Sequence, residues 1–97
     1  MPAEAGKPGL TRHLAIVNER GLHARASAKF VETVERFDAV AEVSRDGQTV
    51  LGDSIMGLLL LAAAPGSEIE VTTTGPEAEA LMEALTTLVA SRFGEDS

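Results

Sequence analysis

The stretch VAEVSRDGQTVL, residues 40–51, contains two short runs of strand-forming residues on either side of Asp46 and Gly47. An Asp-Gly pair supplies the positive φ angles that a two-residue hairpin turn requires. We therefore predict two antiparallel strands, over residues 40–45 and 48–51, and antiparallel pairing as the basis of the sheet.

Two further strands and three helices are expected on either side of this hairpin. Residues 11–17 are rich in strand formers, and residues 68–73 alternate between apolar and polar side chains, as a half-exposed strand does. Apolar positions recur at helical spacing over residues 24–37 and after Pro76, and residues 55–61 form a short apolar helix. The order is βαββαβα, an α+β fold with a four-stranded antiparallel sheet and helices packed on one face.

Composition limits the classes of function. The 97 residues, 44% of them hydrophobic, fit one domain, and the absence of cysteine excludes disulfides and thiolate metal sites. The N-terminus lacks the pattern of a signal peptide, and the longest apolar stretch, residues 55–64, is about half the length of a membrane span. We therefore expect a cytoplasmic protein without membrane insertion.

The charge distribution indicates that one face of the protein could bind an anion. The net charge of −7 disfavours nucleic-acid binding, which depends mainly on basic surfaces. Residues 11–30 nevertheless carry four basic side chains against one acidic one, whereas residues 46–97 carry nine acids against one arginine. This basic segment on an otherwise acidic chain suits a negatively charged group.

The motif GLHAR, residues 21–25, lies where the first strand ends and the first helix begins. The first amides of a helix lack partners and attract anions, so the backbone N–H groups of Ala24, Arg25 and Ala26 are expected to bind phosphate, with the Arg25 side chain assisting. A neutral histidine at this position is nucleophilic, so His23 is the candidate phosphoryl acceptor. His13 lacks such neighbours, and we expect neither a metal nor a cofactor.

A family resemblance accompanies this motif. The segment NERGLHARASAK, residues 18–29, together with Ser54-Ile55-Met56-Gly57 and the βαββαβα order, resembles HPr, the histidine-containing phosphocarrier family of the phosphoenolpyruvate-dependent phosphotransferase system. The similarity covers residues 11–93, leaving an N-terminal tail over residues 1–10 and a C-terminal tail over residues 94–97.

The resemblance implies specific roles and partners. It implies an open-faced β-sandwich whose His23 accepts phosphate on Nδ1 from enzyme I, with help from Arg25, and passes it to enzyme IIA-type proteins. The protein would then be a monomeric carrier that depends on partner enzymes and is not itself an enzyme. The position of Ser54 matches the serine that HPr kinase/phosphorylase modifies in some members.

The region around Ser54 allows two interpretations. A serine before an apolar helix is an ordinary N-cap, and a phosphate at the same position would add negative charge near a docking surface, so both roles are compatible. Ile55, Met56 and Leu59 resemble the family's apolar docking patch, although core packing is the alternative. A short helix cannot bury so many apolar side chains under one small sheet, so we expect some to meet a partner.

The chain departs from the family pattern in two places, of which the second leaves the branch of the system open. Ala26 stands where the family usually has proline, which should loosen the helix start but restores an N–H group. Glu32 and Glu35 stand where sugar-transport members often carry lysines, so a regulatory or nitrogen-related branch is an alternative. An ACT-like small-molecule-sensing module remains a second alternative, because its fold is similar.

Overall fold

The computed structural model describes residues 9–97. Its elements, in chain order, are β2 (Leu10–Ala15), α1 (Ala24–Glu35), β3 (Val40–Arg45), β4 (Gln48–Leu51), α2 (Ile55–Leu61), β5 (Glu68–Thr74), α3 (Ala78–Ala90) and the 3₁₀ turn η1 (Arg92–Gly94). This order confirms the predicted βαββαβα arrangement. Of the predicted N-terminal tail, residues 1–8 lie outside the described residues, and Leu10 already pairs with Thr73 in the sheet.

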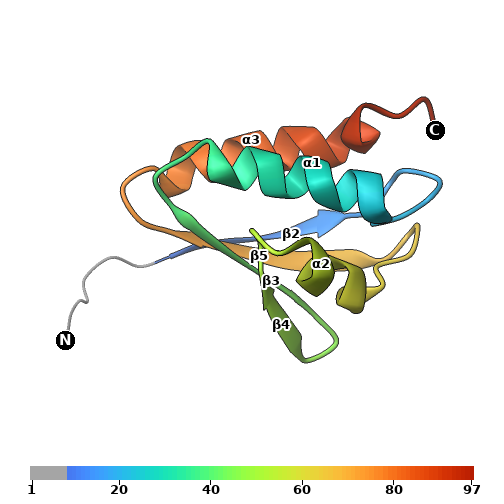
Figure 1. Cartoon of the computed structure of the whole chain (residues 1–97), viewed down its shortest axis with the longest axis horizontal. Coiled ribbons are helices and arrows are strands. Elements are labelled where there is room, and N and C mark those ends of the chain that lie inside the picture. Colours follow the sequence, from blue (N-terminus) through green and yellow to red (C-terminus); the bar gives the residue numbers. More distant parts are fainter. Residues whose placement is uncertain (1–8) are drawn as a thin grey trace.

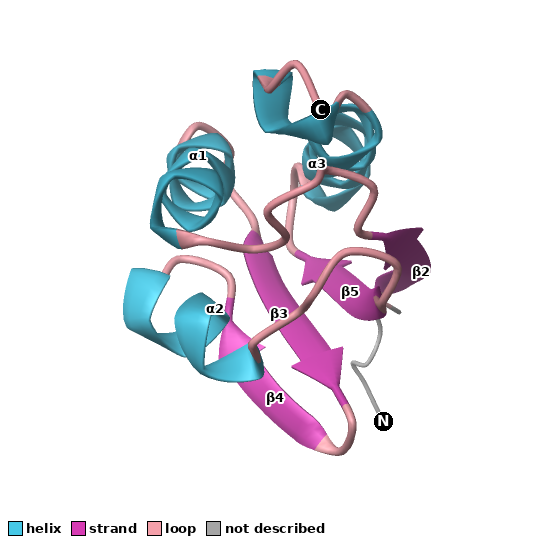
Figure 2. Cartoon of the chain, turned by 90° about the vertical axis from the view of Figure 1, so that its right-hand side faces the viewer, coloured by secondary structure: helices cyan, strands magenta, loops and turns pink. Residues whose placement is uncertain are grey.

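The strands form one sheet in the order β2-β5-β3-β4, and every neighbouring pair is antiparallel. The helices lie on one face of this sheet, with α1 and α3 side by side and α2 beside β3 and β4 (Figures 1 and 2). The predicted α+β fold, a four-stranded antiparallel sheet covered on one face, is therefore confirmed. None of the described helices has the length and apolar character needed to cross a lipid bilayer.

The predicted hairpin forms at the predicted residues. Asp46 and Gly47 both have positive φ angles, 51° and 82°, and Arg45 pairs with Gln48 across the turn. Two successive positive φ angles are those of the type I′ turn, whose twist matches that of the flanking strands. The turn chemistry of two residues thus fixes the register of β3 and β4.

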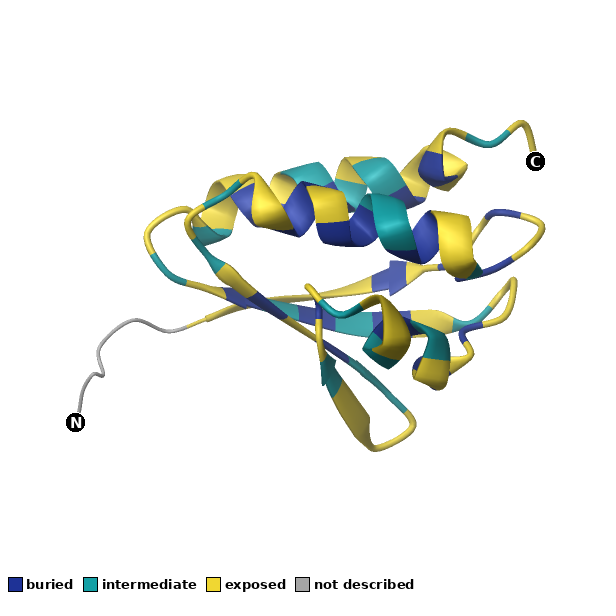
Figure 3. Cartoon of the chain, viewed as in Figure 1, coloured by how far each residue is buried: buried dark blue, intermediate teal, exposed yellow. Residues whose placement is uncertain are grey.

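The core lies between the sheet and the helices. Buried residues alternate along β5 and follow one stripe along α1 and α3, so apolar side chains from both layers meet (Figure 3). Its largest fully buried apolar side chains are Phe30, Phe93, Ile16, Leu58, Ile69, Leu81, Met82, Leu85, Val43, Val71 and Val89. This core fixes the end of β2, the start of α1 and the turn η1 relative to one another.

α2 spans residues 55–61, as predicted, and ends before Pro65 because Ala62 adopts a left-handed conformation and closes the helix. The predicted start of the last helix is wrong by a few residues. α3 begins at Ala78, so Pro76 precedes its first turn. The backbone around Pro76 is held instead by Asp38, whose carbonyl accepts from the Glu77 N–H at 3.0 Å and whose own N–H donates to the Glu77 carboxylate at 2.6 Å.

Candidate functional site

The loop that leads into α1 is held tightly against the segment between α2 and β5. Leu22 is buried, and its N–H donates to the Ala63 carbonyl at 2.9 Å. Gly21 has a φ of +69°, and a Cβ at this position would lie 2.7 Å from the same Ala63 oxygen. Only glycine fits both the backbone conformation and the space, so Gly21 and Leu22 fix where α1 starts.

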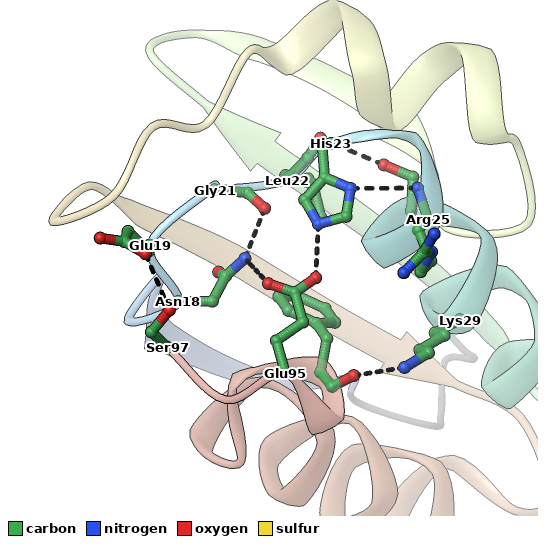
Figure 4. Close-up of polar contacts among 11 residues, drawn as sticks. Asn18, Glu19, Gly21, Leu22, His23, Arg25, Lys29, Glu95 and Ser97 are labelled. Atoms are coloured by element: carbon green, nitrogen blue, oxygen red, sulfur yellow. Dashed lines mark hydrogen bonds and ion pairs between the residues drawn. The ribbon is translucent and has the colours of Figure 1, made fainter.

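His23 is the N-cap of α1, and its side chain turns back onto the helix. Its Nδ1 accepts from the Arg25 N–H at 3.2 Å (Figure 4). Its carbonyl accepts from the Ser27 N–H at 2.8 Å. Among the described residues, the Ala24 and Ala26 amides have no hydrogen-bond acceptor. The ring therefore lies against the first amides of a helix, as the sequence predicts, although Ala26 is wholly buried and Ala24 is exposed.

The opposite edge of the His23 ring contacts a carboxylate. His23 Nε2 hydrogen-bonds to Glu95 Oε2, and each of the two side chains has only 16% of its surface exposed. Asn18 Nδ2 donates to the other oxygen, Glu95 Oε1, at 3.0 Å and to the Gly21 carbonyl at 2.7 Å (Figure 4). The accessible imidazole expected from the sequence is thus largely covered, because residues predicted as a C-terminal tail lie over it.

These contacts assign the protonation of the His23 ring. A backbone N–H can donate only to an unprotonated ring nitrogen, so Nδ1 carries the lone pair and Nε2 carries the proton that faces Glu95. The two nitrogens are therefore distinct before any reaction, with the lone pair of Nδ1 directed toward the helix amides.

Glu95 is held in its ionised form. Burial raises the pKa of its carboxyl, but the hydrogen bonds from Asn18 and His23 and the positive charge of Arg20 lower it by more, so the pKa lies below its ordinary value of 4.5. An anionic acceptor therefore faces Nε2 at neutral pH.

A basic hollow adjoins the ring. Arg20, Arg25 and Lys29 line an open depression of about 320 Å³, closed on the other side by residues 94–97. The Arg25 side chain is exposed, and Lys29 Nζ donates to the Phe93 carbonyl at 2.6 Å. Three of the four basic side chains of residues 11–30 thus line this hollow together with Glu95 and Asp96, whereas Arg12 pairs with Glu83 on α3. The three cations suit a phosphate at this position.

The other histidine lies elsewhere. His13 is on β2, where its exposed ring lies 3.4 Å from the carboxylate of Glu70 on the neighbouring strand. Within residues 9–97, no group of three or more His, Cys, Asp and Glu side chains is arranged to hold a metal ion. His13 therefore faces a carboxylate, as His23 does, but it is exposed on a strand and does not lie at a helix start.

Ser54 is the N-cap of α2. Its Oγ accepts from the Gly57 N–H at 3.0 Å, which confirms the capping role inferred from the sequence. Beyond it, Ile55 and Met56 are exposed, by 39% and 69%, and Leu59 is half-buried. Leu60, on the same helix, is also exposed, by 64%. α2 thus presents an apolar surface that has no partner among the described residues.

Asn18 and Glu95 were not predicted from the sequence. The sequence places Asn18 only in the segment that carries the family resemblance and Glu95 only in a tail, and the contact of Glu95 with His23 joins residues 72 positions apart. The available signal was Phe93, a large apolar residue near the C-terminus that the core has to bury.

Comparisons with known proteins agree on one family. A family profile described as "PTS HPr component phosphorylation site" matches residues 10–91. Phosphocarrier protein HPr from Cupriavidus necator is 45% identical over 86 residues, which are 89% of this chain and 97% of that protein. Phosphocarrier protein HPr from Xylella fastidiosa (strain Temecula1) is 42% identical over 88 residues, 91% of this chain and 99% of that protein.

Solved structures of similar proteins have the same fold. The crystal structure of HPr-C-His from Thermoanaerobacter tengcongensis aligns with a TM-score of 0.87 at 34% identity, covering 91% of this chain and 99% of that chain. The crystal structure of the phosphocarrier protein HPr from Bacillus anthracis aligns with a TM-score of 0.80 at 40% identity, covering 84% and 96%. An ACT-like sensing module, the alternative that the sequence left open, is not supported.

Proposed function

The chain belongs to the HPr family, the phosphocarriers of the phosphoenolpyruvate-dependent phosphotransferase system, and we propose that His23 is the residue that accepts and releases its phosphoryl group. Nδ1 is the proposed acceptor atom. The observation that carries this proposal is the hydrogen bond from the Arg25 N–H to Nδ1, which leaves that nitrogen unprotonated at the start of a helix.

The surroundings of Nδ1 suit both uptake and release of a phosphate. Ala24 is exposed and its amide has no acceptor among the described residues, and the Arg25 amide, which now donates to Nδ1, would donate to a phosphate oxygen once Nδ1 is phosphorylated. The Arg25 guanidinium adds a forked donor from an exposed position. Although Glu95 covers the Nε2 edge of the ring, these donors lie at the exposed start of α1 and stabilise a phosphate on Nδ1 without enclosing it, so a partner retains access to it.

We further propose cytoplasmic partners for this cycle. Enzyme I would supply the phosphoryl group and enzyme IIA-type proteins would receive it, as membership of the family suggests, and the carrier would depend on these enzymes for turnover. The apolar side chains of Ile55, Met56 and Leu59 are the proposed docking residues, to which the exposure of Leu60 adds further apolar surface. Whether the acceptors belong to a sugar-transport or a nitrogen-related branch follows from which IIA protein is phosphorylated.

Ser54 is the proposed site of regulation. A phosphate on Ser54 would place about two negative charges beside Asp53 and the exposed end of α2, which should repel an acidic partner. HPr kinase/phosphorylase is the proposed modifying enzyme, and incubation of the protein with this kinase followed by mapping of the phosphate tests the assignment.

Mapping the phosphate after incubation with enzyme I and phosphoenolpyruvate tests the assignment of His23. We expect one acid-labile, base-stable phosphate that His23→Ala abolishes. His13→Ala is the matched control, because it removes the other histidine from an exposed strand position without touching the loop. A phosphate that persists in His23→Ala, or that His13→Ala removes, would contradict the proposal.

A further inference from the structure

We propose that Glu95 is a positioning residue for phosphoryl transfer: it holds the proton of His23 on Nε2, keeps the lone pair on Nδ1, and compensates the charge that the ring gains when Nδ1 bonds to phosphorus. This inference rests on the proposed role of His23. It assigns a function to residues that follow the last helix and that the sequence pattern leaves as a tail.

The first support is the arrangement of the three side chains. One Glu95 oxygen contacts His23 Nε2 and the other accepts from Asn18 Nδ2 at 3.0 Å, so the carboxylate is fixed at both oxygens (Figure 4). Asn18 is wholly buried, and its second donor contact, to the Gly21 carbonyl, ties it to the loop that ends at His23. A carboxylate that orients an imidazole in this way selects its tautomer.

The buried amide of Asn18 carries an energetic penalty. With Nδ2 committed to Gly21 and Glu95, its Oδ1 is buried without a hydrogen-bond partner among the described residues. A buried oxygen without a partner destabilises a fold, so such groups are uncommon. The orientation that leaves Oδ1 unpaired is the one that places a donor on Glu95.

The backbone before Glu95 supplies the second support. Arg92 and Phe93 have left-handed φ angles of 59° and 56°, and Gly94 follows at 78°. Left-handed conformations are unfavourable for residues other than glycine, particularly for a bulky one. Burial of the Phe93 ring and the hydrogen bond from Lys29 to the Phe93 carbonyl stabilise these left-handed residues. The left-handed residues turn the chain from the end of α3 toward His23.

The chemistry of the step explains what Glu95 contributes. The Nδ1 lone pair forms the bond to phosphorus, the bond between phosphorus and the donor breaks, and its electron pair leaves with the donor. No proton has to leave Nδ1, and the proton on Nε2 stays, so the ring becomes cationic as the bond forms. The Glu95 carboxylate faces that Nε2–H and stabilises the developing positive charge, as charge-assisted hydrogen bonds do.

Glu95→Gln tests this role, and Glu19→Gln is its matched control. Both remove one negative charge near the loop, but the Glu19 carboxylate contacts Ser97 and makes no contact with the His23 ring. Phosphorylation is measured with enzyme I and, separately, with phosphoramidate, a small donor that needs no docking. We expect Glu95→Gln to slow both reactions about tenfold, equivalent to about 1.4 kcal/mol, and Glu19→Gln to leave both within twofold.

The ¹⁵N spectrum of the imidazole supplies a readout that a structural role would not change. In mildly alkaline buffer, where imidazoles are neutral, we expect the His23 proton on Nε2 in the unaltered protein and a larger share of the Nδ1–H tautomer in Glu95→Gln. Unchanged tautomers, or unchanged or faster phosphorylation in Glu95→Gln, would overturn the inference. If His23 accepted no phosphate at all, the proposed function would fail, and the tautomer measurement would still decide whether Glu95 positions the proton.

Discussion

Replacing Gly21 with alanine should displace the loop that carries His23. The φ of +69° adds a penalty of about 1–2 kcal/mol for a side chain in the left-handed region. The new Cβ would also lie 2.7 Å from the Ala63 carbonyl oxygen, a backbone atom that can yield only if the loop shifts. With the strain of that close contact, about 1–2 kcal/mol, we expect a total loss of about 3 kcal/mol in the free energy of unfolding.

Gly66→Ala separates the two contributions. Gly66 also has a positive φ, +86°, but its new Cβ would meet nothing within 4 Å, so this variant carries the conformational penalty alone. Thermal and urea unfolding of both variants should show a fall in Tm of about 12–24 °C for Gly21→Ala and about 4–16 °C for Gly66→Ala. The rate of phosphorylation should fall in Gly21→Ala only, because only that change moves the Leu22 N–H away from Ala63.

Equal losses of stability in Gly21→Ala and Gly66→Ala would refute this reasoning, since the contact with Ala63 would then contribute nothing. The reasoning would also fail if Gly21→Ala lost the predicted stability but accepted phosphate at the original rate. His23 would then not depend on the position of the loop.

Three further predictions follow from single residues. Because the pKa of Glu95 is lowered on folding, Glu95→Gln should reduce the unfolding free energy by a constant amount above about pH 5, and this difference should vanish as the pH falls through the lowered pKa. Unfolding free energies of the unaltered protein and of Glu95→Gln across this pH range measure the difference. Ser54→Ala removes the hydrogen-bond acceptor of the Gly57 N–H and should lower the unfolding free energy by about 1 kcal/mol in urea titrations. An unchanged unfolding free energy would show that this cap does not stabilise the fold. Ala26→Pro loses no hydrogen bond within the described residues and should raise the unfolding free energy by about 0.4–1 kcal/mol. It should also shorten the lifetime of phospho-His23, because proline removes the Ala26 N–H that is expected to bind the phosphate. If neither the unfolding free energy nor the lifetime changes, the presence of alanine at position 26 has no role at the helix start.

Local chemistry explains which parts of the fold were predictable. Asp46 and Gly47 define a turn by their own backbone preferences, and Ser54 caps a helix through a bond to a residue three positions away. Such features depend on neighbours in the sequence, so the strands and helices could be predicted to within a few residues. The start of α3 could not, because Asp38, distant in sequence, binds the backbone at Glu77.

The residues of the site also divide into those that local sequence predicts and those that it does not. His23 and Arg25 could be predicted from the motif because both belong to one helix start. The contact of Glu95 with His23 could not, since it depends on two left-handed residues after α3 and on the burial of Phe93. Helical periodicity contains no information about either, and the expectation of an open imidazole failed for that reason.

The atom that carries the phosphate is the most direct test of the central claim. The phosphorylated protein, labelled with ¹⁵N in histidine, can be examined for a one-bond coupling between phosphorus and a ring nitrogen. We predict that the coupling involves Nδ1 of His23, the nitrogen that accepts from the Arg25 amide. A coupling to Nε2 of His23, or to either nitrogen of His13, would contradict the account.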